Sequence, residues 1–199
     1  MSIYTHQDSN IRKTWFLMLG FLILVIFIGW SLSWYTGSTW LLYLSVAIAL
    51  VMNVTSYWFS DKLVVSMTGA KPMPDEGNFR EVHNIVENLA ITAGLPKPRL
   101  YVVNDQAPNA FATGRDPKHA VVAVTTGLMQ ILDRTELEGV LAHELSHVGN
   151  RDMLVSTVAV VLAGFIAIIA DIFLRMTWFG GNDNRDSKAG AIILVAGII

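Results

Sequence analysis

The 199-residue sequence contains no cysteine. Disulfides and thiolate metal sites are therefore both excluded, and any metal must be held by His, Asp, Glu or water. Charged residues are also scarce, at 15% of the chain, whereas apolar residues make up 53% and the mean hydropathy is +0.47. This balance is typical of a membrane protein with a smaller soluble part. The lipid bilayer is therefore an expected partner. Nucleic acid is not, because a net charge of −2 gives no indication of a nucleic-acid binder.

Charge is missing altogether from two long stretches near the N-terminus. Residues 15–32 read WFLMLGFLILVIFIGWSL and residues 40–59 read WLLYLSVAIALVMNVTSYWF, with Trp and Tyr near the ends. Each is close to the roughly 20 residues that cross a hydrocarbon core, and the connector is short, so we expect a transmembrane helical hairpin over 15–59. A cleaved signal peptide is the alternative for the first stretch, but no convincing cleavage site follows it. The positive residues outside the hairpin place the tail 1–14 and the segment after it in the cytoplasm.

The middle of the chain, residues 60–153, has a mixed charge and the pattern of a small α+β domain. Apolar spacing predicts a helix over 76–93 that ends at Gly94. Strands are predicted at 100–103, 109–113 and 120–125, followed by a short helix at 128–132. Asp133 and Glu136 have the spacing of a capping box that opens a further helix. The predicted order is helix, short sheet, helix.

Further apolar segments follow the domain. Residues 154–174 are of spanning length, and Asp171 lies near their end, either reaching water at the interface or contacting another helix. A polar loop is expected at 175–188. A fourth apolar segment starts at 189 and ends with the sequence at 199, which suggests a truncated chain. The sequence leaves open whether these one or two further segments cross the membrane or pack on the domain.

The most informative stretch is LEGVLAHELSHVGNRD, residues 137–152. His143 and His147 are four residues apart, so they lie on one face of a helix and both imidazoles can reach one metal ion. Zinc suits nitrogen ligands and lowers the pKa of a bound water to about 7, and Glu144 lies within reach as a general base. Two histidines on a helix are more often ordinary surface or core residues. The helix cap and an apolar face favour the metal site; that face comprises Leu137, Val140, Leu141 and Val148.

Three motifs in order extend this interpretation. NAFATGRDP, VVAVTTGL and LAHELSHVGNRD, followed by an apolar segment, resemble the HtpX family of membrane zinc metalloproteases over essentially the whole chain. The resemblance implies a zincin-like domain that faces the cytoplasm from the bacterial cytoplasmic membrane. It implies cleavage of misfolded membrane proteins or unfolded polypeptides in envelope-stress quality control, with one Zn²⁺ on His143 and His147 and Glu144 as the catalytic glutamate. The strand residues Asn109, Ala110, Phe111 and Ala112 are then expected to bind substrate.

The third zinc ligand is missing from this pattern. In the family a glutamate on a later helix supplies it, and no glutamate follows Glu144 in this sequence. The later carboxylates are Asp152, Asp171, Asp183 and Asp186, and none matches the family's glutamate motif. In the family's pattern Asp152 has a supporting or structural role. We therefore expect this chain to bind zinc weakly and to be weakly active or inactive.

Two other functions remain open at this point. One is a catalytically incomplete fragment or membrane adaptor, and the other is a transporter or channel subunit that binds metal in passing. No role is expected for His6, and we expect solvated or hydrogen-bonded side chains for His83 and His119. Arg151 is expected to anchor the interface, or to pair with Asp152 or another carboxylate.

Overall fold

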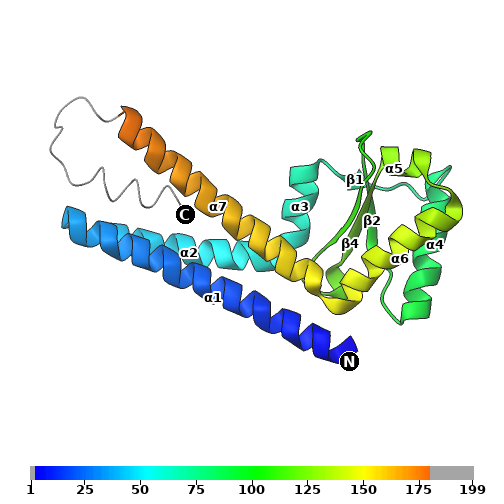
Figure 1. Ribbon diagram of the computed structural model, residues 1–199, viewed down its shortest axis with the longest axis horizontal. Helices are drawn as coiled ribbons and strands as arrows, with labels where there is room; N and C mark the ends of the chain where they lie inside the picture. Colours follow the sequence, from blue (N-terminus) through cyan, green and yellow to red (C-terminus); the bar gives the residue numbers. More distant parts are fainter. Residues whose placement is uncertain (1–2, 180–199) are drawn as a thin grey trace. The chain divides into compact units, whose positions relative to one another are not determined.

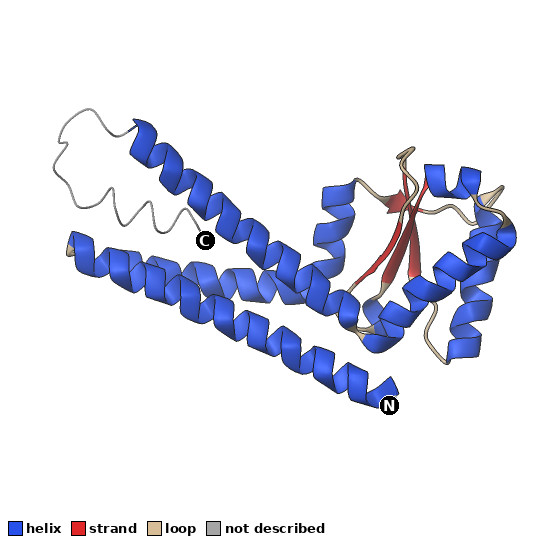
Figure 2. Cartoon of the chain, in the orientation of Figure 1, coloured by secondary structure: helices blue, strands red, loops and turns tan. Residues whose placement is uncertain are grey.

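Most of the described residues are helical, and they also form one small sheet (Figures 1 and 2). The computed structural model describes residues 3–179, and the chain divides into two compact units, residues 1–159 and 160–199. The elements in chain order are α1 (Ile3–Thr36), α2 (Trp40–Trp58), α3 (Ser60–Thr68), β1 (Lys71–Pro72), α4 (Phe79–Ala93), β2 (Arg99–Val103), β3 (Ala110–Thr113), the 3-10 helix η1 (Pro117–His119), β4 (Val121–Thr125), α5 (Thr126–Ile131), α6 (Arg134–Asn150) and α7 (Asp152–Phe179).

Both apolar stretches that the sequence places in the membrane are helical. In the described part of the chain, Gln7–Trp34 in α1 and Trp40–Trp58 in α2 are long and apolar enough to cross a membrane. The helices Arg134–Asn150 and Asp152–Ile168 are bent by 82° relative to each other. They add a third candidate span only if the bent pair is counted as a single span. α1 and α2 lie side by side as a hairpin (Figure 1). Large apolar side chains point away from the contact, as lipid-facing positions do, including Phe16, Ile23, Phe27, Tyr43 and Leu50.

Two elements after the hairpin were not predicted. Phe59, with φ −114° and ψ 19°, interrupts the helical run, so α3 begins as a separate helix at Ser60. It ends at Thr68 and is capped by Gly69, where φ is +64°. β1 has only Lys71 and Pro72, which is too short to show the alternation that identifies a strand from sequence.

The sheet has the order β1-β2-β4-β3. β2 and β4 are parallel, and the two outer strands pair antiparallel to their neighbours. The three predicted strands are confirmed to within one residue at their ends. All five residues of β4, which lies between β2 and β3, are buried. One face of the sheet packs with α4 and α6 into the core, through residues that include Leu100, Val122, Val124, Val86 and Leu141.

The helix caps of the domain follow the sequence. Gly94 ends α4 in the left-handed conformation, and the Asp133–Glu136 capping box opens α6, with Glu136 N–H donating to Asp133 Oδ1 at 2.9 Å. α4 starts at Phe79, three residues after the predicted Glu76, because Gly77 has φ +57° and cannot belong to the helix. α5 starts at Thr126, two residues earlier than predicted, because the Thr125 hydroxyl accepts a hydrogen bond from Leu128 N–H and caps it.

The later segments are described in part. The predicted third apolar segment, 154–174, lies in α7, where the Asp171 side chain is exposed. The fourth apolar segment, 189–199, and the loop residues from 180 onward, with Asp183 and Asp186, lie outside the described residues. The predicted domain boundaries remain predictions.

Candidate metal centre

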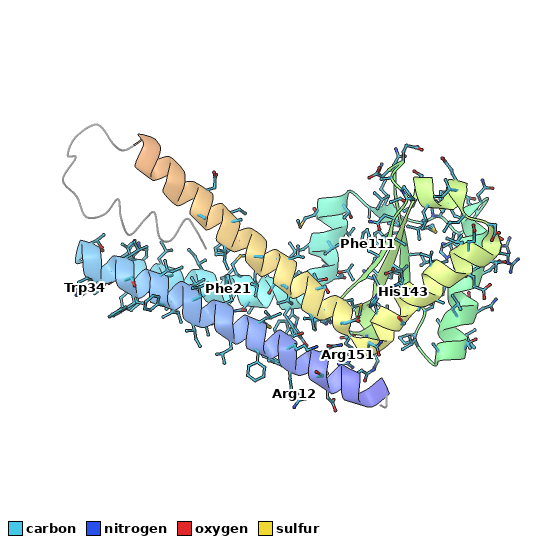
Figure 3. The ribbon with its side chains drawn as sticks, in the orientation of Figure 1. Arg12, Phe21, Trp34, Phe111, His143 and Arg151 are labelled. Atoms are coloured by element: carbon cyan, nitrogen blue, oxygen red, sulfur yellow. The ribbon has the colours of Figure 1, made fainter. Side chains whose placement is uncertain are left out.

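The two histidines of α6 lie together, and Figure 3 labels the first of them, His143, whose side chain is exposed. Their Nε2 atoms are 3.2 Å apart, and the ring centroids are separated by 4.7 Å with the planes at 81°. Two nitrogen ligands of a tetrahedral zinc ion, each at about 2.0–2.1 Å, are themselves about 3.3 Å apart. The separation of the two Nε2 atoms therefore fits one shared cation.

Asp152 holds the second of these rings. His147 Nδ1 lies 2.9 Å from Asp152 Oδ2, so an Nδ1–H donates to the carboxylate and leaves the lone pair on Nε2, the atom that faces His143. Metal-binding histidines commonly have such a carboxylate partner. The contact depends on a sharp turn, since Arg151 has φ 56° and ends α6 before α7 starts at Asp152. A left-handed conformation is costly for a residue with a Cβ atom.

Two buried polar atoms at this turn have no hydrogen-bond partner: Arg151 Nε and Asp152 Oδ1. Arg151 forms no ion pair with Asp152 or with any other carboxylate that the structure describes, so the pairing considered from sequence is not seen. The carboxylate of Asp152 therefore has one oxygen, Oδ1, that accepts no hydrogen bond and lies beside the histidine pair.

Glu144 lies half-buried between α6 and β3. Burial raises the pKa of Glu144, because the charged form loses hydration; the charges of His147 and His143 and a hydrogen bond from Ala112 N–H oppose the rise. The net shift is upward. A carboxylate with a raised pKa is a better proton acceptor than a free glutamate, which suits a general base.

β3 is an outer strand of the described sheet and lies against α6. Thr125 N–H donates to Asn109 O at 2.9 Å, and in an antiparallel ladder such bonds occur at every second residue. Phe111 is therefore bonded to β4 as well, whereas the N–H and C=O groups of Ala110 and Ala112 point outward. The opposite edge differs, because β1 has only two residues and one of them is Pro72, which blunts an edge.

The predicted substrate residues thus separate into two groups. Ala110 and Ala112 present backbone groups to the open edge, and their side chains pack on the core beneath α6. The Phe111 side chain lies on the opposite face of the sheet, because side chains alternate along a strand. Asn109 precedes β3 and is tied to Thr125 through its N–H, at 2.9 Å from Thr125 Oγ1. The alternation was readable from sequence, but which face meets α6 was not.

The histidine pair is not joined by a third ligand in the part of the chain that the structure describes, where no group of three His, Asp or Glu side chains is arranged to hold a metal ion. The other described histidines have local partners, as expected. His83 Nε2 lies 3.3 Å from Met73 O, and His119 Nδ1 lies 2.7 Å from Asp116 Oδ1. The side chain of His6 is outside the described part.

A helix with H-E-x-x-H spacing, an open strand edge beside it and an apolar hairpin define the class of membrane-anchored metallopeptidases. The chain belongs to peptidase family M48, whose family model matches residues 76–199, and it is an HtpX-type protease. The resemblance seen in the sequence motifs is therefore confirmed.

Several curated relatives support this assignment. The chain is similar over its full length to proteins described as "Protease HtpX homolog" from Caldanaerobacter subterraneus subsp. tengcongensis, at 44% identity, and Thermoanaerobacter pseudethanolicus, at 42%. In both cases it covers 68% of the relative. The homolog from Aquifex aeolicus is 49% identical over 82% of this chain and 54% of its own length. The chain thus spans between about half and two thirds of the length of these relatives.

One solved structure is also similar, entitled "Crystal Structure of S. mikatae Ste24p". It shares 15% identity at a TM-score of 0.44, over 93% of this chain and 44% of that chain. A likeness at this level does not bear on the fold or the site.

Proposed function

We propose that this protease is a zinc endopeptidase of the cytoplasmic membrane that cuts misfolded membrane proteins or unfolded polypeptides. In this proposal His143 and His147 hold the zinc ion, Glu144 is the general base, and the open edge of β3 binds the substrate. The domain of residues 60–153 faces the cytoplasm, because positive residues flank the outer ends of the hairpin. The observation that carries the proposal is the 3.2 Å separation of the two Nε2 atoms, with Asp152 behind His147.

The donor set supports zinc as the metal. Two imidazoles in a chain without cysteine suit zinc, whose ligands are commonly His and carboxylate. A zinc ion held by His143 and His147 would polarise the scissile carbonyl and lower the pKa of a water molecule, and these two effects make hydrolysis of the peptide bond easier.

The residues of the chain supply the rest of the chemistry. Glu144 accepts a proton from the attacking water and later donates it to the leaving amine, which keeps the proton balance of hydrolysis. An extended substrate pairs with the outward N–H and C=O groups of Ala110 and with the C=O of Ala112, whose N–H is already bonded to Glu144, and this β-strand addition aligns the peptide bond beside α6. The small side chains at these two positions leave the strand close to the helix.

Metal binding by the full 199-residue chain tests the ligands. Wild-type protein in detergent is titrated with zinc against a chromogenic chelator, beside His143→Ala and His147→Ala. Zinc binding is expected in the wild type and is expected to be lost in both variants. His83→Ala is the matched control, because the His83 ring is hydrogen-bonded to the Met73 carbonyl and lies outside the pair. Zinc binding that survives the loss of both His143 and His147 would overturn the proposed ligands.

A separate measurement tests the general base. In Glu144→Gln the zinc affinity is expected to stay within a few-fold of wild type, while any casein cleavage falls by about 10²–10⁴-fold, the usual contribution of general base catalysis. Cleavage that continues at the wild-type rate in this variant would exclude Glu144 from the reaction.

A non-catalytic membrane adaptor is the second candidate function. It is favoured by one observation, which is that the described residues bring no third ligand to the histidine pair. Zinc-loaded wild-type chain that binds casein but releases no peptides over a day would favour the adaptor. Cleavage that depends on Glu144 would favour the enzyme.

A further inference from the structure

A cavity of about 360 Å³ lies between α3 and the sheet, away from the histidine pair. Arg99, Tyr101 and Val121 line it from β2 and β4, and they alternate with the core residues Leu100 and Val122. The cavity is therefore on the face of the sheet opposite to α6. None of the residues that line it belongs to the proposed metal or substrate site.

The rim of this cavity is positively charged and its floor is apolar. Lys62, Lys71 and Arg99 line it together with one carboxylate, Asp61, so three cations stand against one anion. Asp61 is already paired with Arg99. Neither lysine forms an ion pair with any residue that the structure describes. The cavity therefore offers two uncompensated ammonium groups to a ligand.

The cavity also lies close to the end of a candidate membrane span. α3 follows α2 after the single residue Phe59, and both Trp58 and Phe59 are exposed at this junction. Lys62 Nζ lies 5.5 Å from the centre of the Phe59 ring. If α2 crosses the bilayer, aromatic rings at its end mark the interface, and Lys62, one turn beyond, reaches the headgroup layer.

We propose that this cavity binds the headgroup of an anionic phospholipid. The phosphate contacts Lys62 and Lys71, and the glycerol and upper acyl carbons lie against Val65 and the Tyr101 ring, which are both partly exposed. A free phosphate ion would leave this apolar floor uncovered. The proposal is independent of the peptidase chemistry, because it uses none of the same residues.

Native mass spectrometry of the full chain, released from detergent, tests the site. The protein is mixed with phosphatidylglycerol or with zwitterionic phosphatidylcholine, and the bound fractions are compared. Phosphatidylglycerol is expected to bind more tightly, and Lys62→Gln and Lys71→Gln are each expected to weaken it about fivefold, the usual effect of one basic residue near an anionic lipid surface. Lys71→Arg keeps the charge and is expected to restore binding.

Lys118→Gln is the matched control, since Lys118 is exposed on η1 and does not line the cavity. Its affinity for phosphatidylglycerol is expected to equal that of the wild type, and circular dichroism checks that every variant is folded. Equal binding of the two lipids, or an equal loss in Lys118→Gln, would overturn the proposal. Inorganic phosphate or an acidic peptide that displaces the lipid at micromolar concentration would also overturn it, in favour of a soluble ligand.

Discussion

Asp152 controls how the ring of His147 is held. Its carboxylate accepts the Nδ1–H, which fixes the tautomer that exposes the Nε2 lone pair. In Asp152→Asn this charge-assisted bond is lost, and we expect the zinc affinity to fall about 10- to 100-fold, as is typical for such partners. Chelator competition on the detergent-solubilised chain measures the change.

The same helix provides the control for this prediction. Asp133→Asn makes the same chemical change at the other end of α6, where asparagine is an equally good N-cap. Its zinc affinity is expected to match that of the wild type. If Asp133→Asn and Asp152→Asn weaken zinc binding equally, the loss reflects helix stability and not the contact with His147.

The hairpin depends on one glycine between its helices. A Cβ atom added at Gly29 would lie 2.4 Å from Ser45 Cβ and 1.8 Å from Ser45 Oγ, so α1 and α2 approach each other closely here. Small residues at such contacts let the helix backbones pack. In Gly29→Leu the helices must separate, and we expect a destabilisation of about 1–3 kcal/mol, the usual cost of overpacking. Thermal unfolding in detergent measures it.

Gly20 provides a matched position on the same helix. A Cβ atom there meets nothing within 4 Å, so Gly20→Leu introduces the same side chain without a clash. The midpoint temperature of thermal unfolding of this variant is expected to be equal to or above that of the wild type, because leucine has a higher helix propensity than glycine. Equal destabilisation by both variants would show that the close contact between α1 and α2 at Gly29 does not determine the stability of the hairpin.

Elements that are encoded locally were predictable from the sequence. The C-cap at Gly94 and the capping box at Asp133 involve residues a few positions apart, and both are found in the structure. α3 was missed because its sequence, SDKLVVSMT, has only a short apolar run after a longer one. The start of α4 was placed too early because the conformation of Gly77 does not show in an apolar pattern.

The same division applies to the candidate site. The pairing of His143 with His147 follows from helix geometry alone, so the sequence predicts it. The contact between Ala112 and Glu144 joins a strand to a helix 32 positions away (144 − 112), and no local pattern encodes it. The role of β3 as the open edge likewise depends on the order of all four strands.

Within the first compact unit, residues 1–159, two hydrogen bonds join the start of α1 to the end of α6, the helix that carries the two histidines. Gln7 Nε2 donates to Gly149 O, and Asn10 Nδ2 donates to Asn150 O at 3.0 Å. The last carbonyls of a helix have no partner within it, so α1 satisfies two acceptors of α6 just beyond His147. The hairpin is therefore more than an anchor, since it stabilises the last turn of the helix that carries the proposed ligands.

Replacing both donors tests this coupling. In the double variant Gln7→Ala and Asn10→Ala, two hydrogen bonds of about 0.5–1.5 kcal/mol each are lost. We expect the amides in the last turn of α6 to exchange with deuterium about 5- to 150-fold faster, and zinc affinity to fall because His147 lies in that turn. Arg12→Ala, an exposed position on the same stretch of α1, is expected to exchange like the wild type. Unchanged exchange in the double variant would mean that α6 holds its own C-terminal turn and that the hairpin serves only to bind the membrane.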